Sequence, residues 1–137
     1  MKLFYSIIVL TVCISCNPVK YFVVRHAEKE VPSSGSTMST PNDPPLSAAG
    51  KVRAIELREE LKSQNIQYIF STNTIRTIST ANPLSELRGL KIELYNTRDS
   101  LDYFIKKLKT IIKGNSLIVG HSNTVDDIVN KLCSEIP

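Results

Sequence analysis

Four short runs of β-branched, aliphatic and aromatic residues alternate with stretches of helical periodicity, and this alternation constrains the fold more than any other feature. The apolar runs lie at 21–24, 68–70, 91–94 and 117–119, and the helical stretches at 47–62, 74–81, 101–112 and 121–132. A helical crossover returns the chain to the same end of a sheet, so the strands are expected to be parallel. The pattern predicts an α/β fold, a three-layer α/β/α sandwich with a largely parallel sheet.

Two residues are expected to limit these helices. Pro83 lacks an amide hydrogen and should bend or end the helix that begins at Thr74. Gly114 should close the helix that is entered at Ser100.

The chain of 137 residues has room for one domain, which we place at residues 20–137. Its formal charge of +4 comes from lysines and arginines that are scattered along the chain. Dense basic runs mark nucleic-acid arms, so this distribution argues against nucleic acid as a partner. A mildly positive surface does suit anionic substrates.

Residues 1–16 have the features of a signal peptide of the lipoprotein type. Lys2 is followed by an uncharged apolar stretch that is shorter than the about 20 residues a membrane-spanning helix needs. Ser15 and Cys16 resemble a lipoprotein cleavage site, with Cys16 as the lipidated residue. We therefore expect export to the periplasm or cell envelope and a lipid anchor in the membrane. A buried first strand or an uncleaved anchor is the alternative.

Several residues of chemical interest follow the predicted strands directly. His26, His121 and Ser71, with Arg76 close behind, stand at strand ends, and ligands of parallel sheets bind outside the carboxyl ends of the strands. The chain has only two histidines, and both are in this position. Each alone could be a packing or surface residue. Two histidines without Cys or carboxylates at ligand spacing make a poor metal site, so no metal is expected.

The residues at these strand ends form motifs that resemble the histidine phosphatase superfamily, also called phosphoglycerate mutase-like, and within it the small phosphatases. The matching segments, in order, are Arg25-His26-Ala27-Glu28, Leu46-Ser47-Ala48-Ala49-Gly50 with Arg53-Ala54, Ser71 with residues 76–81, and Val119-Gly120-His121-Ser122. They correspond to the family's Arg-His-Gly motif, Leu-Ser-x-x-Gly segment, Arg-Thr-x-x-Thr-Ala box and second Gly-His. The resemblance implies the phosphoglycerate mutase-like fold.

The resemblance also implies a role for each site residue. His26 would be the nucleophile of a metal-independent phosphohydrolase without cofactor, forming a phosphohistidine from a phosphate monoester or a phosphoprotein. His121 would be the second catalytic histidine and donate to the phosphate. Arg25 and Arg76 would bind the phosphoryl oxygens, assisted by the helix start after Ser71.

The chain departs from the family pattern in ways that leave the proton donor open. Ala27 replaces the usual glycine, and Ser122 with Asn123 stands where one branch carries an acid. Candidate proton donors are Glu28, Asp99 and Asp43, although Glu28 is equally readable as a loop charge. Related domains usually continue into another strand after the last helix, whereas this chain stops at Pro137, so a truncated domain with an exposed sheet edge is expected.

Three alternative functions remain at this point. A phosphoglycerate mutase-type phosphotransferase would need long insertions for which the chain has no room. A serine hydrolase is suggested by residues 120–124, but Thr124 replaces the second glycine of the nucleophile elbow and no histidine follows Ser122. A non-catalytic module could retain the phosphate pocket without the acid.

Overall fold

The computed structural model describes residues 18–31, 43–97 and 100–134, so the predictions for residues 1–16 and for Asp99 lie outside the described residues. Strands and helices alternate along this part of the chain. In order they are β1 (Tyr21–Arg25), α1 (Ala48–Leu61), β2 (Ile66–Ser71), α2 (Ile75–Arg88), β3 (Ile92–Leu94), α3 (Leu101–Lys109), β4 (Asn115–Gly120) and α4 (Ser122–Cys133). None of these helices is both long enough and apolar enough to cross a membrane.

The four strands of the described residues form one parallel sheet with the order β1-β4-β2-β3. The register pairs Arg25 of β1 with Gly120 of β4, and Ser71 of β2 with Val119. The last residues of these three strands therefore lie at one edge of the sheet. This arrangement confirms the predicted parallel α/β fold and positions the residues that follow each strand side by side.

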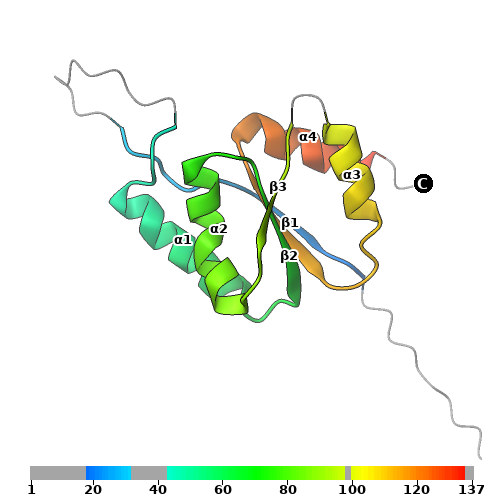
Figure 1. The fold of residues 1–137 in the computed structure, drawn as a ribbon, viewed down its shortest axis with the longest axis horizontal. Coiled ribbons are helices and arrows are strands. Elements are labelled where there is room, and N and C mark those ends of the chain that lie inside the picture. The colour runs from blue at the N-terminus through cyan, green and yellow to red at the C-terminus, as the bar shows by residue number, and fades with distance from the viewer. Residues whose placement is uncertain (1–17, 32–42, 98–99, 135–137) are drawn as a thin grey trace, which may run out of the picture.

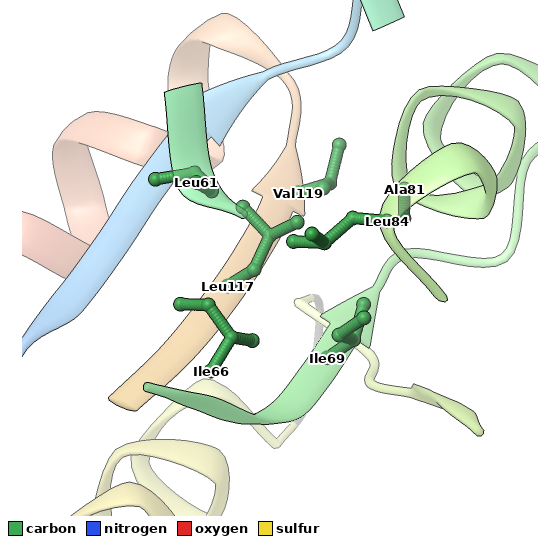
Figure 2. Close-up of a cluster of buried hydrophobic side chains, with 7 residues drawn as sticks. All are labelled: Leu61, Ile66, Ile69, Ala81, Leu84, Leu117 and Val119. Carbon is green, nitrogen blue, oxygen red and sulfur yellow. The ribbon is translucent and has the colours of Figure 1, made fainter. Parts of the chain in front are cut away.

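Helices cover both faces of the sheet, with α1 and α2 on one side and α3 and α4 on the other (Figure 1). Side chains of β4 alternate between the two faces, as expected of an extended strand. Leu117 and Val119 pack against α1 and α2, whereas Ile118 packs against α3 and α4. Figure 2 shows the first core, which consists of Leu61, Ile66, Ile69, Ala81, Leu84, Leu117 and Val119. The predicted three-layer sandwich is confirmed.

Pro83 was predicted to bend or end its helix, and it does not end it, because α2 continues through Pro83 to Arg88. A proline inside a helix costs about 3 kcal/mol relative to alanine. The neighbouring Ala81 and Leu84 are almost completely buried against the sheet, and this packing holds the helix together across the proline. The helix instead ends at Gly89, whose φ of 63° is the left-handed conformation favoured at helix C-termini.

Helix α3 is shorter than the periodicity predicted, because it ends at Lys109 and not near Ile112. Thr110 forms its C-cap, with its amide donating to Lys107 O at 3.0 Å and its hydroxyl donating to the same oxygen at 2.7 Å. Ile112 then lies outside the helix and is 89% exposed. Gly114, with φ of 84°, belongs to the turn that enters β4.

Candidate active site

The two histidines of the chain meet at the carboxyl edge of the sheet. His26 follows β1 and donates its amide hydrogen to Gly120 O at 2.9 Å, which ties it to the end of β4 where His121 begins. The ring centroids of His26 and His121 are 5.3 Å apart, with an angle of 68° between the ring planes. Two imidazoles that are 95 residues apart in sequence are thus brought together by the adjacency of β1 and β4.

The backbone of His121 is held by close packing at the start of α4. His121 N donates to Thr124 Oγ1 at 2.7 Å, and a Cβ on Gly120 would stand 2.5 Å from that oxygen and 2.8 Å from Tyr95 Oη. Only glycine therefore fits before His121 without a shift of its neighbours.

Arg76 is brought to the same place by the first turn of α2. Thr74 caps this helix by accepting from Thr77 N, and Arg76 then directs its guanidinium toward the histidines. Its Nη2 lies 3.5 Å from His121 Nδ1, and its Nη1 donates to Asp43 Oδ1 at 3.0 Å. The side chain is only 17% exposed, and its Nε is buried without a hydrogen-bond partner in the described part of the chain. Buried donors are usually paired, so an anion oxygen would fit this nitrogen.

Arg25 and Ser71 lie differently from Arg76. Arg25 is exposed at the end of β1 and borders a hollow of about 210 Å³ beside α1. Burial is the largest cause of the lowered pKa of both histidines, and the positive charge of Arg25 lowers it less than that of Arg76 does. Ser71 is fully buried, and its hydroxyl donates to Thr72 O at 2.9 Å. The structure therefore does not bring the Ser71 hydroxyl to the histidines.

The hydroxyl that reaches the site belongs to Thr72, which the sequence reasoning missed. Thr72 Oγ1 lies 3.1 Å from His121 Nε2. The missed signal was positional: His26 and His121 each follow the last residue of a strand directly, and Thr72 has the same position after β2.

The Leu-Ser-x-x-Gly segment supports the loop that carries His26. Ser47 caps α1 by accepting from Gly50 N, and it contacts Glu28 O through its amide at 2.9 Å and its hydroxyl at 3.2 Å. The replacement of the family's glycine by Ala27 is accommodated, because this residue is buried with Leu46 and Ala54. The backbone N–H of Ala27 is buried but not unpaired, because it donates to Thr80 Oγ1 of α2 at 3.0 Å.

Replacement of Gly50 by alanine is expected to destabilise the protein. A Cβ at Gly50 would stand 2.1 Å from Glu28 O, a backbone atom that cannot rotate away. Overpacking of this kind costs about 1–3 kcal/mol. Thermal or urea denaturation should show this loss for Gly50→Ala, whereas Lys51→Ala, on the exposed side of the same helix, should stay within about 0.5 kcal/mol of the parent. Equal stability of the Gly50 variant and the parent would contradict the close approach.

Two of the three candidate proton donors are visible, and both are paired with arginines. Glu28 is bound by Arg53, with 2.7 Å between Oε1 and Nε. Hydrogen bonds from its own backbone amide and from Arg53 lower the pKa of Glu28, which favours a carboxylate over an acid. Asp43 accepts from Arg76 and, at 2.8 Å, from Ile75 N at the start of α2. Of these two described candidates, Asp43 is therefore the one that contacts Arg76.

Burial lowers the pKa of both histidines below the usual 6.5, and the positive charge of Arg76 lowers both further. The unfolded chain therefore binds more protons than the folded chain at pH values just below 6.5, so stability rises with pH in this range. We expect the urea midpoint to fall as the pH is lowered through about 6.5. Since the chain has no other histidines, a His26→Gln/His121→Gln double variant should lose most of this dependence. An unchanged slope in that variant would contradict the assignment.

The described residues contain no group of three or more His, Cys, Asp or Glu side chains that could hold a metal ion. A cavity of about 570 Å³ lies beside His121, and its described lining is rich in hydroxyl and amide side chains. The lining consists of Thr72, Asn73, Thr74, Leu94, Tyr95, Asn96, Thr97 and His121.

Comparison with known proteins identifies the family. The sequence model of the histidine phosphatase superfamily (branch 1) matches residues 21–103, which is more than half of the chain. The chain belongs to this superfamily. The match includes His26 and Arg76 and ends before His121, so the structure supplies the position of the second histidine.

Similar proteins agree with this assignment. Phosphoserine phosphatase 1 of Hydrogenobacter thermophilus is 36% identical over 74 residues, which are 54% of this chain and 35% of that enzyme. The matched region thus spans about a third of the length of that relative. The phosphoserine phosphatase of Entamoeba histolytica, solved with 3-phosphoglyceric acid, has a TM-score of 0.66 at 14% identity, over 85% of this chain and 81% of that one. The protein histidine phosphatase SixA, solved with tungstate, has a TM-score of 0.66 at 16% identity, over 85% of this chain and 78% of that one. These two likenesses show the phosphoglycerate mutase-like fold.

Proposed function

We propose that this protein is a metal-independent phosphohydrolase that acts through a phosphohistidine on His26. The observation that carries the proposal is the meeting of His26, His121 and Arg76 at one edge of the sheet. A phosphatase of this kind needs a nucleophile and fixed positive charge around one tetrahedral anion. Phosphoserine phosphatase 1 and SixA are similar proteins whose names state phosphatase activity, which supports the same reaction here.

The hydrogen bonding of His26 suits a nucleophile. Its Nδ1 lies 2.7 Å from Ala27 O, and a carbonyl oxygen only accepts, so Nδ1 carries the ring proton. The lone pair is then on Nε2. Burial lowers the pKa of His26, which keeps the ring neutral near pH 7. A neutral ring with Nε2 unprotonated is the form that can attack phosphorus.

The reaction proceeds in two displacements. In the first, the Nε2 lone pair of His26 forms an N–P bond while the bond from phosphorus to the leaving oxygen breaks, and an acid protonates that oxygen. In the second, water forms a bond to phosphorus and gives a proton to the conjugate base of that acid, while the N–P bond breaks and His26 regains its lone pair. Arg76, Arg25 and His121 supply positive charge to the equatorial oxygens. Glu28, Asp43 and Asp99 remain the candidate acids.

The substrate class is a phosphate monoester or a phosphoprotein. The cavity of about 570 Å³ beside His121 has room for a leaving group the size of a small alcohol or a side chain. Its described lining contains uncharged hydroxyl and amide groups, which suit a polar leaving group.

The decisive experiment is a rapid quench of purified protein with a ³²P-labelled phosphate monoester. Acid-labile, base-stable label on the protein is expected for the parent and not for His26→Ala. An excess of chelator should leave turnover of an aryl phosphate unchanged, and a loss of turnover would count against metal independence. Saturable binding of inorganic phosphate without turnover or labelling would favour the non-catalytic module.

For residues 1–16 we propose a lipoprotein signal with lipidation at Cys16, which would place the protein in the cell envelope. The basis is the charged start, short apolar stretch and Ser15-Cys16 pair. Mass spectrometry of protein from membranes should find diacylglycerol on Cys16, and Cys16→Ala should lack it. Intact Met1 on the exported protein would contradict this proposal.

A further inference from the structure

Three threonine hydroxyls form a hydrogen-bonded chain that ends on the ring of His121. Thr77 Oγ1 lies 2.8 Å from Thr72 O and 3.0 Å from Thr74 O. Carbonyl oxygens only accept, so the single hydroxyl proton of Thr77 is directed to them. Thr77 Oγ1 is therefore an acceptor for the other two hydroxyls, Thr74 at 2.8 Å and Thr72 at 3.1 Å.

This chain determines the direction of the bond between Thr72 and His121. Thr72 Oγ1 donates its one proton to Thr77, so it accepts from His121 Nε2 at 3.1 Å. The other ring nitrogen leads to the same result. His121 Nδ1 lies 3.5 Å from Arg76 Nη2, and a guanidinium has only donors, so the nitrogen that faces it carries the lone pair. Both neighbours of the ring select the tautomer with the proton on Nε2.

We propose that Thr72 is a positioning residue for His121, which accepts the Nε2 proton and holds the ring with Nδ1 toward Arg76 and the phosphoryl site. The proposal deepens the proposed function and rests on it for the effect on turnover. Thr72 is 6% exposed, and its hydroxyl is held between Thr77 and His121 at the wall of the cavity. Loss of this acceptor would leave the ring N–H without its fixed protein partner and allow the ring to flip or change tautomer.

Because Nε2 already carries a proton, Nδ1 is the nitrogen that can take up a proton from solvent once a phosphate dianion, and not Arg76 Nη2, is its partner. Among the described residues, the charged or titratable groups near His121 are Arg76 from α2, His26 after β1, Asp43 before α1, Arg25 at the end of β1 and Tyr95 after β3, which lines the same cavity. Burial and the positive groups lower the pKa of His121, whereas Asp43 raises it. A bound phosphate adds negative charge beside Nδ1, so the proton taken up there can be donated to a phosphoryl oxygen.

The test compares Thr72→Val with Thr72→Ser in the full-length protein. Valine matches the shape of threonine without the hydroxyl, and serine restores the oxygen. Thr110→Val is the matched control, because Thr110 lies at the end of α3, before β4 begins, and its hydroxyl donates to Lys107 O. Histidine ¹⁵N and ¹³C NMR shifts report the tautomer of His121, with His121→Gln for assignment. Kinetics with an aryl phosphate over a pH series give kcat, KM and the acidic limb of the pH–rate profile.

We expect His121 in the parent to be protonated on Nε2. In Thr72→Val we expect a larger population of the tautomer that is protonated on Nδ1. At metal sites, loss of the hydrogen-bond partner that orients a histidine lowers metal affinity or activity by about 10- to 100-fold. For Thr72→Val we expect a fall of about ten-fold in kcat with little change in KM. Thr72→Ser should recover most of the rate, and Thr110→Val should match the parent. A parent ring protonated on Nδ1 overturns the proposal even if Thr72→Val fails to fold, as does equal impairment of the serine and valine variants. A parent that shows the Nε2 tautomer but no turnover refutes the proposed function and leaves the tautomer assignment standing.

Discussion

His26→Ala should reduce turnover of an aryl phosphate by about a thousand-fold or more, because the variant has no ring nitrogen to form the N–P bond. The other groups around the anion, Arg76 and His121, would still bind phosphate. The affinity for inorganic phosphate, measured by isothermal titration, should therefore change much less than kcat. Circular dichroism and thermal denaturation would establish that the variant is folded.

Ser122→Ala is the control for this experiment. Ser122 is the exposed first residue of α4, and a serine hydrolase would need it as nucleophile. We expect this variant to retain the parent rate. The opposite result, an inactive Ser122→Ala variant and an active His26→Ala variant, would refute the phosphohistidine mechanism and favour the serine hydrolase.

Arg76→Ala should lower kcat by about a thousand-fold, the lower end of the range observed for arginines that stabilise phosphoryl transfer. Arg76→Lys keeps the charge and should lower kcat by about a hundred-fold. The guanidinium contacts Asp43 through Nη1 and His121 through Nη2, and its buried Nε has no partner among the described residues. A lysine has one compact ammonium group, which cannot hold Asp43 and the phosphoryl oxygens in the same geometry.

Arg58→Lys is the matched control for the arginine series. Arg58 lies on α1 and pairs with the neighbouring Glu59 at 2.7 Å, so the same change of side chain there should leave kcat unchanged. Steady-state kinetics and phosphate titration should show that both Arg76 variants also bind inorganic phosphate more weakly. Full rescue of turnover by lysine would contradict fork-like binding of the anion by Arg76.

The architecture could be predicted because each strand and helix has a recognisable pattern in its own stretch of sequence. The apolar run of β4 is buried on both faces between two layers of helices, so it reads as a continuous hydrophobic segment. The ends of α2 and α3 could not be predicted in the same way. Burial of Ala81 and Leu84 outweighs the cost of Pro83, and a threonine cap ends α3 before its apolar pattern does.

The site was partly predictable for the same reason. His26 and His121 follow strand ends, and parallel strands bring their carboxyl ends to one edge. Thr72 was missed because the family motif pointed to Ser71 and not to the residue directly after the strand, the position that both histidines have. The structure buries Ser71 and places Thr72 Oγ1 beside His121 Nε2.

The sequence by itself determined the succession of strands and helices, the superfamily and the two imidazoles at strand ends, since these depend on local composition and on the order of motifs. The tertiary structure alone decided the contacts between distant segments. In the tertiary structure Asp43 pairs with Arg76, Gly50 packs against the backbone of Glu28, and Thr72 contacts His121. These contacts form because the strand order β1-β4-β2-β3 brings together segments that are far apart along the chain.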